Sequence, residues 1–301
     1  MADDAVPSGF DEVQRQFAAL RQSLSTDGET LRSTDERQLL VDQVRDALDR
    51  GEERLSDKKT MIVANTFVLE EIIHHGTHTE VYRARHRDLG TFHAIKTLST
   101  DHSGNLLARQ LLLREAEIGL PLRHTNIVAT QALLRLNDGR PALVFEWAGK
   151  SLADFLRQGP IPISTIKALM PGVLSGLAAL HDAGVVHCDV SPSNLLLEGD
   201  RPETVRLADL GVALEIGNRH ADLDLSFAGQ PAFAPPEQRA GEPLDGRCDL
   251  YAAGRLLSRL LDMCSESTDG SPLYALAAHL SQPNRDARPE NARAAAALFS
   301  L

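Results

Sequence analysis

Residues 187–194 read His-Cys-Asp-Val-Ser-Pro-Ser-Asn, and residues 209–211 read Asp-Leu-Gly. The intervening residues 195–208 form two short apolar runs around a turn, which predicts a β-hairpin. Asn194 and Asp209 then lie on opposite arms at the open end of the hairpin, where their side chains can meet. One carboxylate and one amide oxygen at that spacing suit Mg²⁺, which takes few protein ligands and relies on substrate phosphates for others.

Asp189 lies five residues before Asn194 on the same loop. It is predicted to face the metal, either as a base or as the group that positions an attacking hydroxyl. Taken singly, an acid at a loop position is more often a cap or turn residue. The prediction therefore depends on the residues that accompany it.

A lysine and a glutamate upstream form a second part of the same pattern. Lys96 ends the apolar strand predicted at 92–96, and Glu115 lies on a helix predicted over 105–120. A buried lysine is costly unless it is paired, so we expect a Lys96–Glu115 ion pair. The chain has 26 arginines and only five lysines, so a lysine at a strand position is unusual and could hold phosphate oxygens.

Working outward, the chain changes from short strands to helices. Strands are expected at 61–71, 81–86, 91–98, 127–136 and 141–145. After Lys150 the pattern is mostly helical, with the 195–208 hairpin as the exception. We therefore expect an α+β architecture, with a strand-rich lobe over about 61–146, a helical lobe over about 150–301, and a ligand-binding cleft between them.

Residues 1–60 form a separate, charged extension with helical periodicity. Phe10, Val13, Phe17, Leu20 and Leu24 are spaced 3, 4, 3, 4, which marks one face of a helix. A turn at 25–28 and a second helix over about 35–55 complete a predicted helical hairpin, with Ser33 or Thr34 as N-cap. Two interpretations stay open: a hairpin that lies on the main domain, or a docking or self-association module within residues 10–55.

In their order, these motifs resemble the eukaryotic-like protein kinase superfamily, in its bacterial serine/threonine branch. The resemblance covers residues 62–301 and implies a bilobal kinase fold. Segments 94–96, 143–147, 187–194, 209–211 and 229–237 are similar to the ATP-binding strand, the hinge, the catalytic loop, the metal-binding triplet and the end of the activation segment. The resemblance also implies that Asp249 anchors the catalytic loop and that Glu237 pairs with Arg288.

The resemblance implies the following site residues. Asp189, Lys96 and Asn194 are the catalytic candidates, and Asn194 and Asp209 are the candidate Mg²⁺ ligands. The candidate ATP-binding residues are Gly76, Val81, Ala94, Lys96, Glu115, the gatekeeper Phe145, the backbone of Glu146 and Ala148, and Asp209.

Four departures from the family pattern bear on activity. Only Gly76 remains of the phosphate loop's glycines, so its amides approach phosphates less closely. Cys188 stands where the family often has arginine, which disfavours control by activation-loop phosphorylation. Ser191 replaces a lysine that neutralises the transferred phosphoryl group, and Gln230 replaces the threonine that contacts that lysine. Finally, the short spacing from Asp249 to Arg288 predicts reduced peripheral helices.

Composition excludes several other classes of protein. The net charge of −11 disfavours a nucleic-acid or anionic-membrane binder. Three cysteines without short pair spacing favour a reduced compartment over disulfides or zinc. The acidic start lacks a secretory signal and no uninterrupted apolar run predicts a membrane span, so we expect a cytoplasmic protein without membrane insertion.

Three functions are compatible with these residues. The favoured one is transfer of the γ-phosphoryl group of MgATP to serine or threonine of a protein, in bacterial signalling that extends to a secretion apparatus such as type VI. The second is a pseudokinase or kinase-fold scaffold that binds nucleotide or a partner without efficient transfer. The third is a small-molecule phosphotransferase, which the 229–237 segment and the Asp249 helix disfavour.

Overall fold

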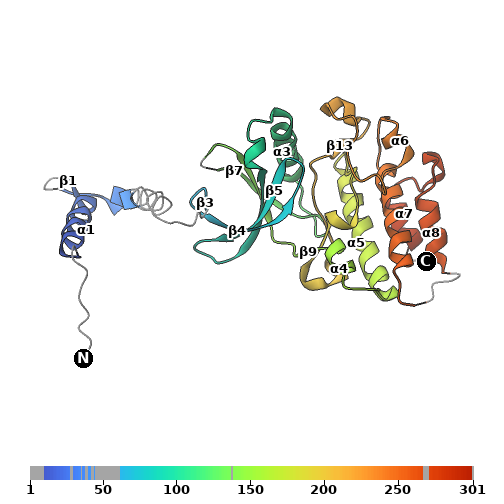
Figure 1. Cartoon of the computed structure of the whole chain (residues 1–301), viewed down its shortest axis with the longest axis horizontal. Coiled ribbons are helices and arrows are strands. Elements are labelled where there is room, and N and C mark those ends of the chain that lie inside the picture. Colours follow the sequence, from blue (N-terminus) through green and yellow to red (C-terminus); the bar gives the residue numbers. More distant parts are fainter. Residues whose placement is uncertain are drawn as a thin grey trace.

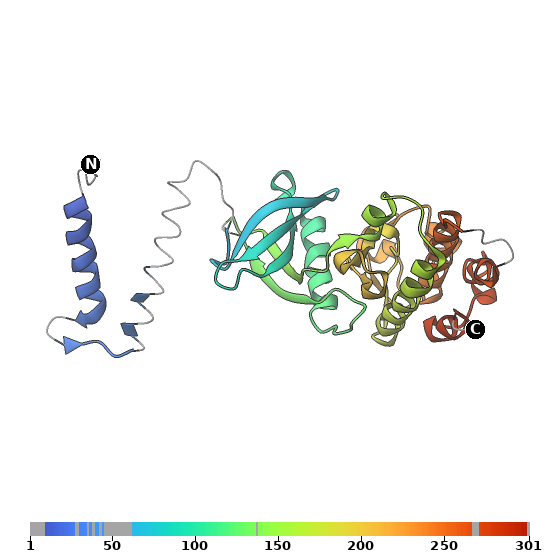
Figure 2. The ribbon, with the colours of Figure 1, turned by 90° about the horizontal axis from the view of Figure 1, so that it is seen from below.

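The structure is a computed structural model. It describes residues 10–27, 30–34, 36–37, 40–41, 44, 62–136, 138–266 and 271–299. Two lobes follow a separate N-terminal segment, as Figures 1 and 2 show.

A six-stranded antiparallel sheet forms the N-terminal lobe, in the spatial order β3-β4-β5-β6-β8-β7. Its strands are β3 Ile62–Val63, β4 Phe67–His75, β5 Thr79–His86, β6 Phe92–Leu98, β7 Thr130–Arg135 and β8 Pro141–Glu146. Neighbouring side chains on a strand point to opposite faces. On β8, Val144 accordingly packs in one apolar cluster with Ile95, and Leu143 packs in another with Leu98.

Helix α3, Leu106–Gly119, covers the face of the sheet that carries Leu98 and Leu143. Asn105 caps its N-terminus by accepting a hydrogen bond from the N–H of Ala108 at 3.0 Å. The buried residues of the helix are Ala108, Leu112, Glu115, Ala116 and Gly119. Packing of Leu112 against the sheet therefore fixes the rotation that turns Glu115 inward.

One predicted strand is interrupted. The run expected at 61–71 is divided into β3 and β4 by a turn at Ala64 and Asn65, whose φ angles are 48° and 56°. Asn tolerates this left-handed region because its side chain can bond locally, but nothing in the apolar pattern marks the turn.

Helices build the C-terminal lobe around a buried core. They are α4 Leu152–Leu156, α5 Ile163–Asp182, α6 Pro236–Arg239, α7 Arg247–Asp262, α8 Pro272–Leu280 and α9 Ala292–Phe299. Helix α5 contributes Leu169, Met170 and Leu177 to this core, and α7 contributes Leu256 and Leu260. After α7, the described residues up to Arg288 form α8 and the 3₁₀ turn η6, Arg285–Ala287, so few peripheral helices are present.

Helix α5 is long and apolar enough to cross a membrane by length and composition alone. Half of its most apolar window is buried inside the structure, and it packs against α7 and α9. These contacts are those of the core helix of a lobe.

Two small sheets flank the loop 187–194. The predicted hairpin is present as β11 Leu195–Leu197 and β12 Arg206–Leu207, with β9 Lys150–Ser151 as a third strand. A second sheet pairs β10 Val185–Val186 with β13 Leu214–Glu215. The expectation of a single hairpin after Lys150 was therefore wrong, because strands of two residues are too short to show an alternating pattern.

The N-terminal segment contains helix α1, Phe10–Ser25, followed by a hairpin of β1 Thr26–Asp27 and β2 Thr30–Leu31. The hairpin occupies the place where a simple turn was expected. The predicted second helix, 35–55, lies mostly outside the described residues. Ser33 and Glu36 bond reciprocally, with the Glu36 N–H donating to Ser33 Oγ at 3.2 Å and the Ser33 N–H to the Glu36 carboxylate at 2.9 Å. This is a capping box.

Candidate active site

Lys96 of β6 binds two carboxylates, one from α3 and one from the segment that follows β12. Its Nζ donates to the Glu115 carboxylate of α3 at 2.8 Å and to the Asp209 carboxylate at 2.7 Å. Lys96 is 9% exposed and Glu115 is 1% exposed. The predicted Lys96–Glu115 pair is confirmed, and Asp209 is a second partner of the same ammonium group.

The electrostatics of this cluster favour ionised Lys96 and Asp209. Burial opposes the charge on Lys96, but the charges of Asp209 and Glu115 raise its pKa above the ordinary value. Burial also opposes the charge on Asp209, yet Lys96 and the N–H of Gly211 lower the pKa of Asp209 to about 2. Burial raises the pKa of Glu115 to about 7 against the charge of Lys96. Asp209 is thus the constant anion of the cluster.

The catalytic loop orients Asn194 and Asp189 toward each other. Asn194 ends the 3₁₀ turn η2, Pro192–Asn194, and its Nδ2 donates to the Asp189 carboxylate at 2.7 Å and to the Asp189 carbonyl at 2.9 Å. These bonds use the amide nitrogen, so Oδ1 is the atom that could ligate a cation. Burial raises the pKa of Asp189, against the charge of His187 and the N–H of Gln230.

The hairpin brings this loop to Asp209. The N–H of Ala208 donates to the carbonyl of Asn194 at 2.9 Å, one residue before Asp209. Asp209 has a φ of 65°, and 42% of its side chain is exposed. The predicted meeting of the two hairpin arms is therefore present in the backbone.

Asp249 of α7 holds the backbone at the start of the loop 187–194. Its carboxylate accepts from the N–H groups of His187 at 2.8 Å and Cys188 at 2.9 Å, and His181 Nε2 lies 2.9 Å away. Asp249 is fully buried, and Cys188 has a φ of 67°. A left-handed backbone at a non-glycine residue persists only where surrounding contacts hold it.

Ser191 and Gln230, which both depart from the family pattern, are bonded to each other. Gln230 Nε2 donates to Ser191 Oγ at 2.7 Å, and the Gln230 N–H donates to Asp189 Oδ1 at 2.8 Å. Ser191 is fully buried. The segment that begins at Gln230 is thus hydrogen-bonded directly to Asp189, a candidate catalytic residue.

The predicted nucleotide residues line the sheet side of the same region. Val81 of β5 pairs with Lys96, and Ala94 pairs with Phe145. At the tip between β4 and β5, the Gly76 N–H donates to the Thr79 carbonyl at 2.8 Å.

The hinge follows β8. The Glu146 N–H donates to the Ala129 carbonyl at 3.0 Å, and its carboxylate accepts from the Ala129 N–H at 2.7 Å and from Arg206 at 3.3 Å. Ala148 is 3% exposed. The Glu146 N–H is therefore bonded within the protein. That the backbone of Glu146 and Ala148 faces adenine stays a prediction, which for Glu146 concerns the carbonyl.

Sequence reasoning missed Gln238. Its Nε2 donates to the carbonyls of Cys188 and Ala228, both at 2.8 Å, and its Oε1 accepts from Cys248 Sγ at 3.1 Å. Gln238 is buried in α6, where it joins the catalytic loop to the activation segment. Its position between Glu237 and Arg239, directly after the apolar run 231–236, is a weak signal for this role.

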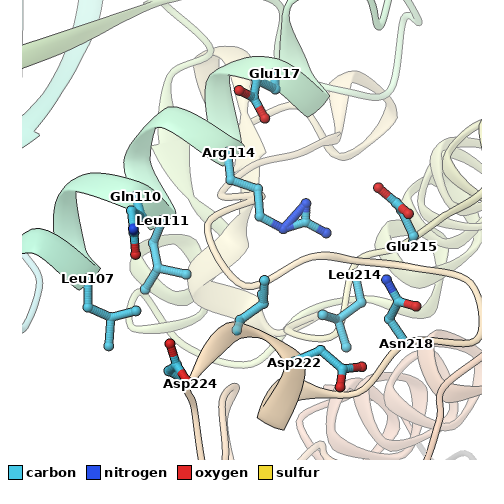
Figure 3. A pocket seen from close by; sticks show the side chains of 11 residues that line it. Leu107, Gln110, Leu111, Arg114, Glu117, Leu214, Glu215, Asn218, Asp222 and Asp224 are labelled. Atoms are coloured by element: carbon cyan, nitrogen blue, oxygen red, sulfur yellow. The ribbon is translucent and has the colours of Figure 1, made fainter.

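A cavity of about 400 Å³ lies away from these residues, between α3 and the segment 214–224. Figure 3 shows Arg114 pointing from α3 into it, opposite Glu215. None of the catalytic candidates lines this cavity.

Comparison with known proteins supplies the family. The family model for the protein kinase domain matches residues 67–281 of this chain, which is more than half of its length. The chain belongs to the protein kinase superfamily.

Bacterial relatives of this kinase domain carry the same family name. The serine/threonine-protein kinase PknJ of Mycobacterium tuberculosis is 33% identical over 222 residues, covering 71% of this chain and 37% of that protein. The serine/threonine-protein kinase PkaA of Streptomyces coelicolor is 32% identical over 238 residues, covering 74% and 44%. The chain thus matches less than half the length of these two relatives.

The fold agrees with a solved kinase domain. The PknI kinase domain of Mycobacterium tuberculosis superposes with a TM-score of 0.60 at 20% identity, covering 81% of this chain and 98% of that one. At this identity the likeness establishes the bilobal kinase fold.

Proposed function

We propose that residues 61–301 form a serine/threonine protein kinase domain that transfers the γ-phosphoryl group of ATP, with Mg²⁺, to a hydroxyl of a protein substrate. The observation that carries the proposal is the bridge of Lys96 between Glu115 and Asp209 beside the Asp189–Asn194 pair. Chains that lose phosphoryl transfer need not preserve all five of these groups.

The donor set fits a hard cation with phosphate ligands. An ionised Asp209 and the free Oδ1 of Asn194 are the oxygen ligands that Mg²⁺ prefers. Mg²⁺ would neutralise charge on the phosphates and hold them in line for transfer. Lys96 would bind the α- and β-phosphate oxygens as a fixed cation.

The chain's own residues would supply positioning. Asp189, held by Asn194 and by the Gln230 N–H, orients the acceptor hydroxyl and accepts its proton. The hinge would bind adenine through the Glu146 carbonyl and the Ala148 backbone, beside the gatekeeper Phe145. The raised pKa of Asp189 moves it toward that of a working base.

Ser191 favours a second candidate function, a kinase-fold scaffold with little or no transfer. Its buried hydroxyl is bonded to Gln230, where the family pattern places a cation near the transferred group. A missing cation at that point can cost a few kcal/mol of transition-state stabilisation. We also propose a signalling context, namely a cytoplasmic bacterial pathway that controls a type VI secretion apparatus. This part of the proposal rests on the family resemblance alone.

Incubation with labelled ATP and Mg²⁺ tests the proposal. Asp189→Asn and Lys96→Ala should each lower incorporation into protein at least about 100-fold. Lys167→Ala, which changes an exposed lysine of α5, is the matched control and should retain wild-type incorporation. Equal labelling in all four proteins would reject transfer by this site. Stabilisation by MgATP without labelling would favour the scaffold instead.

A further inference from the structure

Three arginines of the C-terminal lobe differ from the others in their partners. Residues 150–301 contain eleven arginines, and eight of them form ion pairs with Asp or Glu within the described part of the chain. Arg239, Arg255 and Arg259 form no such pair among the described residues. All three are exposed, in a chain with an excess of acids.

These arginines surround one short segment, Pro231–Phe233. Arg239 of α6 donates to the carbonyl of Pro231, and Arg255 Nε donates to the carbonyl of Ala232 at 3.4 Å. Arg255 and Arg259 lie four residues apart on α7, and therefore on the same face of the helix. Three positive charges from two helices, α6 and α7, thus gather at one place.

A cavity of about 200 Å³ opens at that place. Its lining residues are Ala232, Phe233, Arg255, Ser258, Arg259 and Asp262. Asp262 is the one carboxylate in the lining, and within the described residues it forms no ion pair with either arginine. The guanidinium groups are therefore available to an incoming anion beside the buried ring of Phe233.

The cavity is close to the place of the acceptor hydroxyl. The N–H of Gln230 donates to Asp189 Oδ1 at 2.8 Å, and Phe233 is three residues further along the chain. Three residues span at most about 11 Å. With the 2.8 Å hydrogen bond, Phe233 is at most about 14 Å along the chain from Asp189 Oδ1. An extended peptide advances about 3.3 Å per residue, so the cavity lies within about four residues of the acceptor in a substrate.

We propose that the cavity beside Phe233 is a specificity pocket for an anionic side chain, within about four residues of the serine or threonine that the domain phosphorylates. Arg255 and Arg259 are its specificity-determining residues, and Arg239 adds to the positive potential. Guanidinium groups bind carboxylates and phosphates through paired hydrogen bonds, so both anions are ligands of this class. The inference rests on the proposed kinase function and names its substrate class, an acidic peptide.

A peptide scan tests the pocket. Peptides with a single acceptor serine carry Asp, Glu, phosphoserine or Lys at each position from four residues before it to four after it. Transfer is measured as kcat/KM, and binding as fluorescence anisotropy with a non-hydrolysable ATP analogue and Mg²⁺. The wild type should favour an anion at a position within about four residues of the serine by about tenfold or more, a difference of ~1.4 kcal/mol. A preference for phosphoserine over Glu at that position would indicate a phosphorylated substrate, and the reverse would indicate a carboxylate.

Charge reversal gives the decisive comparison. Arg255→Glu with Arg259→Glu should reverse the preference to Lys at that same position, whereas a general loss of folding would lower all peptides equally. Arg293→Glu, at an exposed arginine of α9, is the matched control and should keep the wild-type profile. Identical positional profiles in the wild type and the double variant overturn the pocket. Selective binding without transfer supports the pocket and rejects the proposed activity, whereas transfer without selectivity does the opposite.

Discussion

Ser191 and Gln230 form the contact that bears most directly on the proposed transfer. Gln230 fills the space beside a buried serine, two residues after Asp189, where a lysine would meet developing negative charge. A neutral amide–hydroxyl bond satisfies both groups but adds no positive charge. At the scale of single residues, we therefore expect the missing positive charge at position 191 to limit the proposed transfer.

Restoring the cation should raise the rate. We expect Ser191→Lys combined with Gln230→Thr, in which the shorter side chain makes room, to increase kcat by about tenfold or more, or ~1.4 kcal/mol of barrier. Gln230→Thr alone is the control and should give no such gain. An unchanged kcat in a double variant with the wild-type Tm would show that another group already neutralises the phosphoryl charge.

The buried side chain of Arg288 is expected to stabilise the folded protein. It is 5% exposed, makes two hydrogen bonds of 2.6 and 2.9 Å to the Glu237 carboxylate, and also donates to three backbone carbonyls. Lysine cannot reproduce this fork, so Arg288→Lys should lower the free energy of unfolding by about 3–5 kcal/mol in urea denaturation. Arg293→Lys, at a largely exposed pair, should cost less than about 1 kcal/mol. A loss below ~1 kcal/mol for Arg288→Lys contradicts the assignment.

Close packing of α5 is the element-scale feature that places the catalytic hairpin. A Cβ at Gly176 would lie 2.7 Å from the Asn126 carbonyl oxygen and 2.8 Å from Leu207 Cδ1 of β12. Helix α5 can therefore approach β12 this closely only because residue 176 has no side chain. The Leu207 N–H also donates to the Asn126 carbonyl at 2.8 Å, so this contact holds the β12 arm, which leads to Asp209.

Gly176→Ala should consequently destabilise the protein despite the better helix propensity of alanine. We expect overpacking to lower the free energy of unfolding by about 1–3 kcal/mol, of which the gain in propensity offsets up to ~1 kcal/mol. Gly104→Ala, where a Cβ meets no atom within 4 Å, should be close to neutral. If denaturant titration gives both variants the same midpoint, α5 is not limited by this contact.

The segment between Asp209 and Gly229 contains a buried residue whose protonation depends on pH. His220 begins the 3₁₀ turn η5, His220–Leu223, is 3% exposed, and contacts the Val212 carbonyl at 3.2 Å. Burial lowers its pKa, so the folded state releases a proton that the unfolded state binds near pH 6.5. The free energy of unfolding should thus fall as the pH decreases below about 6.5.

His220→Gln retains a hydrogen-bond donor without the titration. Between pH 7 and pH 5, its free energy of unfolding should decrease less steeply than that of the wild type, as measured by urea titration. His279→Gln, at an exposed residue of α8, should keep the wild-type slope. Parallel slopes for all three proteins would exclude His220 as the source.

At the scale of the whole molecule, the exposed face of α1 sets the question of assembly. Val13 is 61% exposed and Phe17 is 67% exposed, and both lie on the apolar face at 3–4 spacing. Figures 1 and 2 draw α1 apart from the kinase domain. Exposed aromatic and aliphatic side chains in a row favour a partner helix, and we propose that a second copy of the chain supplies it.

Removal of residues 1–58 should then halve the molar mass measured by light scattering. Phe17→Asp in the full-length chain should have the same effect, because a carboxylate at an apolar interface is costly to bury. The same mass in all three proteins would reject self-association through α1. Transfer activity of the truncated kinase domain, measured in parallel, reports whether assembly also affects catalysis.

Much of the site could be predicted from residue types and their order. Three local signals were available: a lone lysine on an apolar strand, a glutamate on the next helix, and an Asp–Asn loop before a hairpin. The fold brings these residues close together, as expected. The second partner of Lys96, the two hydrogen bonds that Asn194 donates to Asp189 and the buried role of Gln238 carried no comparable signal. Each depends on segments brought together from distant parts of the chain.

The lobes, the hairpin at 195–208 and the charge-bearing residues could be predicted from the amino-acid sequence, because strand and helix periodicities report burial over neighbouring positions. The turn at Ala64–Asn65, the sheet of β10 and β13, and the three arginines near Phe233 that form no ion pair among the described residues became visible only in the fold. Two-residue elements are too short to have a period. Contacts across α6, α7 and the activation segment depend on how helices pack, which no local pattern encodes.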